Sequence, residues 1–193
     1  MTFAALRLYG FAPDAAIDRP FDSGVVSAAE PDVLMEILDP RIGMAVWDRA
    51  ASSPGGMPVS PHGPDWLADI SDRPDQVPAA LGRCWPGRLP AWLAADAGRL
   101  AGLLAALAGS RAVRLRLRRG EDPRPECPPA SGLALVCRYA GSPLAVRREG
   151  RPLPEAWLDP HAVGLIRAPH LLFAGNAAGD LTLTIHALET ATP

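Results

Sequence analysis

Four histidines and three cysteines are the side chains in this sequence best suited to bind a metal ion or to act as a nucleophile. Their spacing matches no short metal or redox signature, because nine residues separate Cys127 from Cys137 and no two histidines are close neighbours. Cys127, His170 and His186 could form a zinc or iron site if folding brought them together. The spacing favours reduced thiols and no metal site, so we expect no cofactor. Fe(II) or Zn(II) would be bound only in the alternative case, in which these three residues form a metal site.

The remaining histidines carry weaker signals. His62 lies in a proline-rich segment and His161 in an Asp-Pro-His turn, and both are interpreted as solvated loop residues. The sequence also lacks a complete glycine-rich phosphate loop and a Gly-x-Ser-x-Gly turn. We therefore find no complete catalytic motif, and the sequence favours a protein that is not an enzyme.

Alternating segments predict where polar side chains gather. VRLRLRR at 113–119 alternates strictly, which predicts a half-buried strand with Arg114, Arg116 and Arg118 on one face. That face could be solvated or could line an anion-binding groove. In LTLTIHAL at 181–188, Thr182, Thr184 and His186 lie opposite the apolar residues. In a barrel this polar face could point inward; on an open strand it would face solvent.

Four residues are candidates for ligand binding: Arg49, Arg116, Arg138 and Tyr139. Planar guanidinium groups suit carboxylates and phosphates, and a tyrosine offers a rigid ring with a polar tip. The alternative is that these side chains form ion pairs and pack in the core. We expect a small anionic ligand or a protein partner, and a structure in which the four side chains point to separate surfaces would contradict a common site.

Charge and hydropathy exclude several classes of protein. The 19 basic residues, all arginine, and 21 acidic residues give a net charge of −2 at pH 7, which argues against nucleic-acid binding by bulk electrostatics. No apolar run reaches the roughly 18 residues of a membrane span. The first ten residues show no secretory signal, so we expect a cytoplasmic protein without membrane contact.

We interpret the chain as a single domain over 1–193 with an N-terminal arm at 1–30. The distribution of prolines divides it into segments. Eight of the 22 prolines lie between Pro54 and Pro90, so we expect 50–90 to be loops without long helices or central strands. A leucine-rich stripe predicts a long helix over 91–109, and 112–190 is expected to be rich in strands. The periodicity predicts a further helix at 31–39, a short strand from Ile42, and strands at 113–119, 132–139, 162–167 and 181–188.

The predicted order gives the fold class. Helices and proline-rich loops come first, one long helix follows, and strands complete the chain. This order predicts an α+β fold with a mostly antiparallel C-terminal sheet or barrel.

Several of these segments resemble the bacterial family of unknown function numbered 1826. The resemblance lies in EILDPRIGMAVWDR with Trp47 and Arg49, the leucine-rich helix, VRLRLRR, and the Cys-x-Tyr-x-Gly segment from Cys137 to Gly141. It covers roughly residues 32–188. The family has a His-x-Asp motif and a distal His-Arg-Ser-Pro motif, which correspond to the ligand set that non-haem Fe(II) oxygenases place on a double-stranded β-helix. The resemblance therefore implies a fold of that kind.

The sequence departs from this family at the ligand positions. The first histidine falls on Cys127, the aspartate on Pro129, and the distal motif near Phe173, Ala174, Gly175 and Asn176. Proline and phenylalanine side chains cannot coordinate a metal. The resemblance thus implies a degenerate relative that binds a ligand or partner without catalysis; the alternative is an oxygenase-like metal enzyme with a relocated site.

Overall fold

The computed structural model describes residues 24–49, 66–85, 89–119, 132–148, 156–167, 170–173 and 180–188. Its strands form a seven-stranded sheet in the order β1-β2-β8-β5-β10-β4-β3 and a three-stranded sheet in the order β7-β6-β9. Every pairing is antiparallel except that of β1 with β2. The predicted α+β class with a mostly antiparallel sheet is therefore confirmed.

The N-terminal part places two strands at one side of the large sheet. β1 (Gly24–Ala28) pairs in parallel with β2 (Ile42–Trp47), and η1 (Pro31–Leu38) connects them. The helix predicted at 31–39 is present as a 3₁₀ helix that begins at Pro31, where a proline costs no hydrogen bond. Within the stretch 1–30 that the sequence presents as an N-terminal arm, β1 is a regular strand with two buried valines, and it pairs with β2.

The proline-rich region also contains regular structure, so the loop prediction for 50–90 is wrong in part. β3 (Trp66–Asp72) forms the edge of the large sheet, and η3 (Pro74–Gln76) leads into α1 (Val77–Cys84). Pro74 and Pro78 lie in the first turns of these helices, where proline is favoured. The described part holds only short helices and an edge strand, as proline requires.

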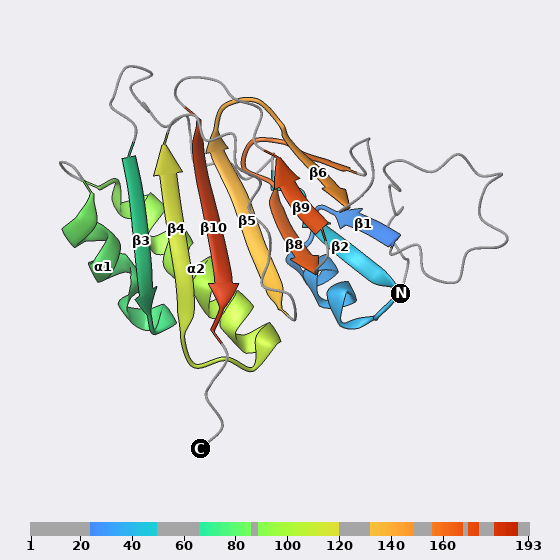
Figure 1. Ribbon diagram of the computed structural model, residues 1–193, viewed down its shortest axis with the longest axis horizontal. Coiled ribbons are helices and arrows are strands. Elements are labelled where there is room, and N and C mark those ends of the chain that lie inside the picture. Colours follow the sequence, from blue (N-terminus) through green and yellow to red (C-terminus); the bar gives the residue numbers. More distant parts are fainter. Residues whose placement is uncertain are drawn as a thin grey trace, which may run out of the picture.

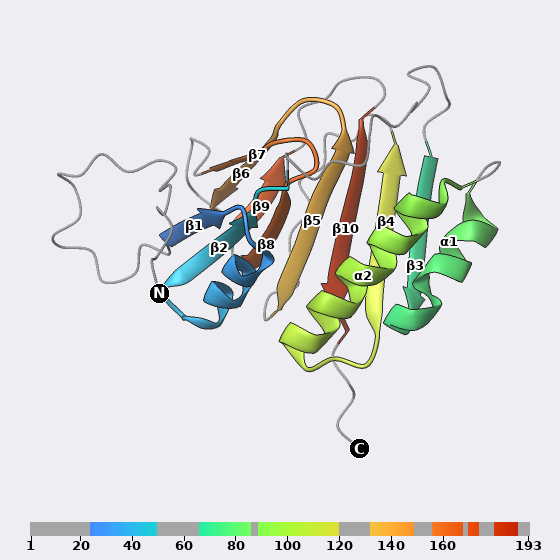
Figure 2. The same cartoon turned by 180° about the vertical axis from the view of Figure 1, so that it is seen from behind.

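One long helix covers the sheet. α2 (Ala91–Ala108) ends at Gly109, which takes the left-handed conformation that favours glycine (φ 62°). By length and composition α2 could cross a membrane. Six of its residues are nevertheless buried in the core: Leu93, Ala97, Leu100, Ala101, Leu104 and Ala105. Figures 1 and 2 show α1 and α2 together on one face of the sheet.

The four predicted C-terminal strands are all present and adjacent in the large sheet: β4 (Val113–Arg119), β5 (Leu133–Ala140), β8 (Val163–Arg167) and β10 (Leu181–Ala187). The small sheet was not predicted. It consists of β6 (Leu144–Arg148), β7 (Ala156–Leu158) and β9 (His170–Phe173). From β5 onward the chain therefore crosses repeatedly between the two sheets: it enters the small sheet for β6 and β7, returns for β8, and crosses again for β9 before β10.

Two apolar layers enclose the large sheet. The larger layer lies between the sheet and the helices, and the smaller one joins β1, β2, β5 and β8 to the small sheet. Among the described elements, neither a helix nor a small-sheet strand covers the outer face of β3, β4 and β10 (Figure 1). This side of the sheet carries polar side chains, of which Thr182 and Thr184 are buried.

A glycine permits close contact between the two sheets. A Cβ at Gly164 would lie 2.7 Å from Leu158 Cδ1 and 3.2 Å from Val136 Cγ1. Gly164→Ala should therefore lower the free energy of unfolding by about 1–3 kcal/mol, because the added methyl overpacks the layer. Urea unfolding would measure this.

Gly102→Ala is the matched control, since its Cβ would meet nothing within 4 Å and it lies in α2. That variant should be neutral or more stable by up to about 1 kcal/mol. Equal effects of the two substitutions would contradict the packing argument.

Candidate functional site

Strand alternation in β5 divides the four predicted binding residues. Cys137 and Tyr139 contribute to the core beneath the helices, whereas Val136 belongs to the layer under the small sheet. Arg138, between Cys137 and Tyr139, therefore points away from the helices. Arg49 lies with Tyr139 on the helix side, and Arg116 lies with Arg138 on the opposite face. The four residues form two separate pairs, so the expectation of one common site is wrong.

The first pair meets at a buried carboxylate. Arg49, just after β2, donates from Nη1 to Asp96 Oδ1 at 2.7 Å and from Nη2 to Asp96 Oδ2 at 3.0 Å. Its Nε donates to the carbonyl of His161 at 2.9 Å. Tyr139 donates its hydroxyl to Asp96 Oδ2 at 2.7 Å. This arrangement ties the end of β2, helix α2, β5 and the β7–β8 turn to one point.

Burial and hydrogen bonding set the ionisation of this cluster. Burial opposes ionisation of Asp96, but hydrogen bonds from Arg49, Tyr139 and Arg99 outweigh it, so the pKa of Asp96 lies below its ordinary value. Burial raises the pKa of Tyr139 well above its ordinary value. The side chains of Arg49 and Asp96 are only 8% and 13% exposed. Arg49, Arg99 and Tyr139 all donate to the Asp96 carboxylate. These contacts indicate that Arg49 and Tyr139 have a structural role.

His161 is part of this cluster rather than a free loop residue. Its ring packs edge-on against the ring of Tyr139, with 6.3 Å between the ring centroids, and its backbone has φ 72°. The interpretation of His161 as simply solvated is therefore wrong. Asp96 was not predicted, although a lone acidic residue among the alanines and leucines of 91–109 was a detectable signal.

Cys137 lies against Arg49 but is poorly suited to be a nucleophile. Its Sγ is 3.1 Å from Arg49 Nη2, yet complete burial raises the pKa of the thiol to about 12. The thiolate is the reactive form of cysteine. Cys137 is therefore an inert core residue.

The second pair belongs to a surface that we call the arginine face. It is the side of β3, β4, β10 and β5 that points away from the helices, and it consists of Asp69, Arg114, Arg116, Arg118, Arg138, Asp180, Thr182, Thr184 and His186. Arg114 and Arg116 converge on Asp69, with Arg114 Nη2 and Arg116 Nε at 2.6 and 3.1 Å from its Oδ2. These contacts lower the pKa of Asp69.

The inner end of the arginine face contains a fully buried arginine. Thr182 on β10 lies in register with Arg118 on β4 and with Arg138 on β5, so one cross-strand row places a hydroxyl between two guanidinium groups. Arg138 Nη1 lies 3.2 Å from Asp180 Oδ2 and donates to the Ser142 carbonyl at 2.5 Å. Burial lowers the pKa of Arg138, and Arg118 adds to this effect while Asp180 opposes it.

The predicted metal ligands are only partly placed. His186 lies on the arginine face, in register with Arg114. His170 begins β9, whereas Cys127 and His62 lie outside the described residues. Within the described ranges, no group of three or more His, Cys, Asp or Glu side chains could hold a metal ion.

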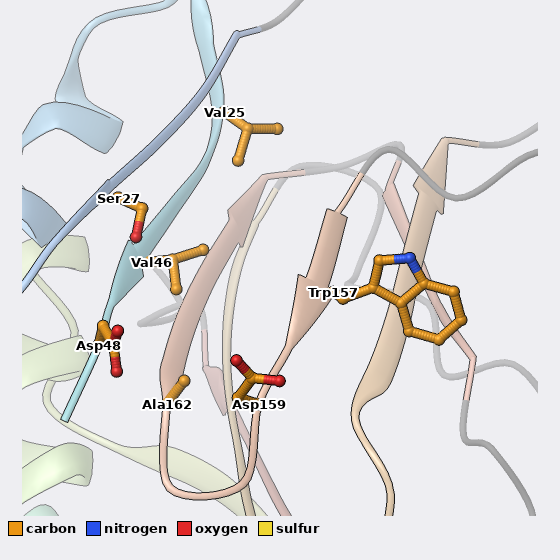
Figure 3. Close-up of a pocket in the computed structure, with 7 residues that line it drawn as sticks. All are labelled: Val25, Ser27, Val46, Asp48, Trp157, Asp159 and Ala162. Atoms are coloured by element: carbon orange, nitrogen blue, oxygen red, sulfur yellow. The ribbon is translucent and has the colours of Figure 1, made fainter. Parts of the chain in front are cut away.

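An open pocket lies elsewhere, beside β1, β2 and β7. It is lined by Val25, Ser27, Val46, Asp48, Trp157, Asp159 and Ala162. Figure 3 shows the Trp157 indole turned away from the other lining side chains. Both carboxylates are exposed to solvent. The arginine face, which has a buried charge and converging donors, is therefore the better candidate site.

Comparisons with known proteins assign no family. No family model matches the chain, and no curated protein matches it. One similar crystal structure is an oxidoreductase of the 2OG-Fe(II) oxygenase family from Burkholderia pseudomallei, at 14% identity and TM-score 0.43 over 81% of this chain and 87% of that one. Another is a prolyl-4-hydroxylase from Pseudomonas putida, at 14% identity and TM-score 0.44 over 84% and 100%. At these values the likeness establishes no function.

Asp96→Asn should destabilise the protein by about 2 kcal/mol at neutral pH, because the substitution leaves Arg49 buried without its counter-charge. The lowered pKa of Asp96 means that this contribution is complete above the unfolded pKa and is lost as the pH falls through the folded pKa. Urea unfolding at neutral and acidic pH would show the difference from the wild type shrinking in acid.

Exposed Glu36 provides the control for Asp96, and Glu36→Gln should change stability by less than about 0.5 kcal/mol. A deficit of Asp96→Asn that stays constant from neutral pH to acid would contradict an ionised Asp96 as the source of the stability.

Cys137 should resist thiol reagents in the native state. We would treat a Cys127→Ser variant with dithiobis(nitrobenzoic acid), which releases one thionitrobenzoate for each thiol that reacts. Native protein should release about one equivalent, through exposed Cys84, and unfolded protein about two. Native Cys84→Ser/Cys127→Ser protein should react at least about tenfold more slowly than the same protein in urea. Equal rates would show that the Cys137 thiol is accessible.

Proposed function

We propose that this protein is a non-catalytic binding domain that takes a small anionic ligand, a carboxylate or a phosphate, on the arginine face. The observation that carries the proposal is the row of Arg118, Thr182 and Arg138, with a buried guanidinium and a hydroxyl directed at the same place. Arginine forks and hydroxyl groups are typical ligands of oxyanions.

The charge balance of the arginine face supports an anion. Its described residues comprise four arginines and two aspartates, Asp69 and Asp180. Asp69 accepts from two arginines at once, and Asp180 lies against Arg138. Among the described residues of this face, arginines therefore outnumber aspartates by two, and its threonines are almost fully buried. An anionic ligand would reduce this excess.

We further propose that the fold is a double-stranded β-helix-like barrel and that the chain is a degenerate relative of family 1826. The alternation of the chain between the large and small sheets supports the barrel. Of the family's ligand positions, the distal one falls at Phe173, which ends β9. Within the described ranges no group of three or more His, Cys, Asp or Glu side chains could hold a metal ion, and the function proposed for this chain uses none.

Anion binding can be measured directly. Inorganic phosphate and acetate, titrated calorimetrically at constant ionic strength, should bind the wild type, and Arg116→Gln/Arg118→Gln should bind at least about tenfold more weakly, because charged hydrogen bonds are lost. Arg41→Gln is the matched control: Arg41 is exposed and pairs with Asp39 away from the arginine face.

Unchanged affinity in the double variant would overturn the proposal. A second measurement addresses the enzyme alternative: protein loaded with Fe(II) or Zn(II), desalted and analysed for metal. Near-stoichiometric retention would favour an oxygenase-like enzyme with a relocated site, and His170 and His186 would then be the first residues to substitute.

A further inference from the structure

We infer that the oxyanion of the ligand binds at one specific point of the arginine face: against the Nε–Nη2 edge of Arg138, beside the Thr182 hydroxyl and facing Arg118. This inference rests on the proposed function and assigns it an anchor. It places the ligand at the inner row of Arg118, Thr182 and Arg138 rather than at the outer pair, Arg114 and Arg116, which converge on Asp69.

The hydrogen bonds of Arg138 are unevenly distributed. Nη1 has two good acceptors, the Ser142 carbonyl and Asp180. Nε has only a long contact to Thr182 Oγ1 at 3.4 Å, near the limit for a hydrogen bond. Nη2 is buried and has no hydrogen-bond acceptor among the described residues. One side of a completely buried guanidinium thus has strong acceptors, whereas the other side has only the long contact to Thr182 among the described residues.

The Nε–Nη2 edge of Arg138, which lacks a strong acceptor, faces Thr182 in the same row. In a guanidinium the Nε–H and one Nη2–H bond point in parallel and form the edge that grips a carboxylate or phosphate with two hydrogen bonds. Because Nε points at Thr182, Nη2 is directed to the same side. Thr182 lies between Arg138 and Arg118 in the sheet register, so an oxyanion at this edge would also lie near Arg118.

Asp180 holds a different side of Arg138. It approaches Nη1, and its Oδ1 lies only 1.7 Å from where a Cβ at position 141 would stand. Gly141 (φ 112°) therefore leaves room for this carboxylate against the β5–β6 turn. Asp180 is thereby kept against the turn, and the Nε–Nη2 edge remains for another acceptor.

The chemistry of the row defines the ligand group. Two parallel N–H donors, a hydroxyl and a second guanidinium suit a carboxylate or a phosphate, which share the needed pair of oxygens. Along the strands the next row contains Arg116, Thr184 and Val136.

The decisive variant is Thr182→Val, which removes a hydroxyl and changes neither charge nor size. It should weaken binding of inorganic phosphate or acetate about tenfold, while Thr184→Val, the same change in the next row of the same strand, should alter it less than about twofold. Acetate and phosphate are titrated separately, so their affinities also distinguish a carboxylate from a phosphate ligand.

A second variant removes the anchor itself. Arg138→Gln/Asp180→Asn deletes both charges of the buried pair together and so avoids an unpaired buried aspartate. It should abolish detectable binding, whereas Arg114→Gln on the outer pair should retain affinity within about threefold. Thermal unfolding of each variant checks that it is folded; if the double variant is not, Thr182→Val against Thr184→Val decides.

The outcomes separate this inference from the proposed function. If wild-type protein binds neither anion, the proposed function fails and the inference fails with it. If Arg116→Gln/Arg118→Gln loses binding but Thr182→Val equals Thr184→Val, the face binds anions and only the anchor at Arg138 is wrong.

Discussion

The ion pair between Arg49 and Asp96 is the contact on which the arrangement of the sheet and the long helix depends. It is almost completely buried, and a buried charge is tolerated only when it is paired and hydrogen-bonded. All three guanidinium nitrogens of Arg49 have partners, which come from α2, β5 and the turn before β8. Because these partners lie on three separate elements, α2 has one position over the sheet that satisfies them all.

This constraint also determines the opposite face. Tyr139 reaches Asp96 on the helix side, so strand alternation directs Arg138 to the other side of β5. The register of β5 with β10, and of β10 with β4, then brings Thr182 and Arg118 beside it. A slip of one residue in β5 would exchange the two faces and bury Arg138 under the helix. The core contact and the candidate site are therefore consequences of one register.

The sequence predicted long periodic elements well and short ones poorly. α2, β4, β5 and β10 were found because their helical spacing or alternation extends over at least seven residues, and the apolar run of β8 was found although it has only five. β6, β7 and β9 have three to five residues and were missed, since so short a segment carries little periodicity. The partners of the arginines were missed because pairing is long-range: 47 positions separate Arg49 from Asp96. Spacing cannot predict such a contact without the fold.

Comparing the two buried arginines distinguishes a structural role from a binding role. Arg49 follows β2 and Arg138 lies in β5, and both face a carboxylate. Every nitrogen of Arg49 has a protein partner, so a ligand would have nothing to add there. Arg138 has strong acceptors on Nη1 alone, although it is the more deeply buried of the two. A buried donor without an acceptor destabilises the fold, and the described residues offer no acceptor for Nη2, so the proposed ligand would supply one.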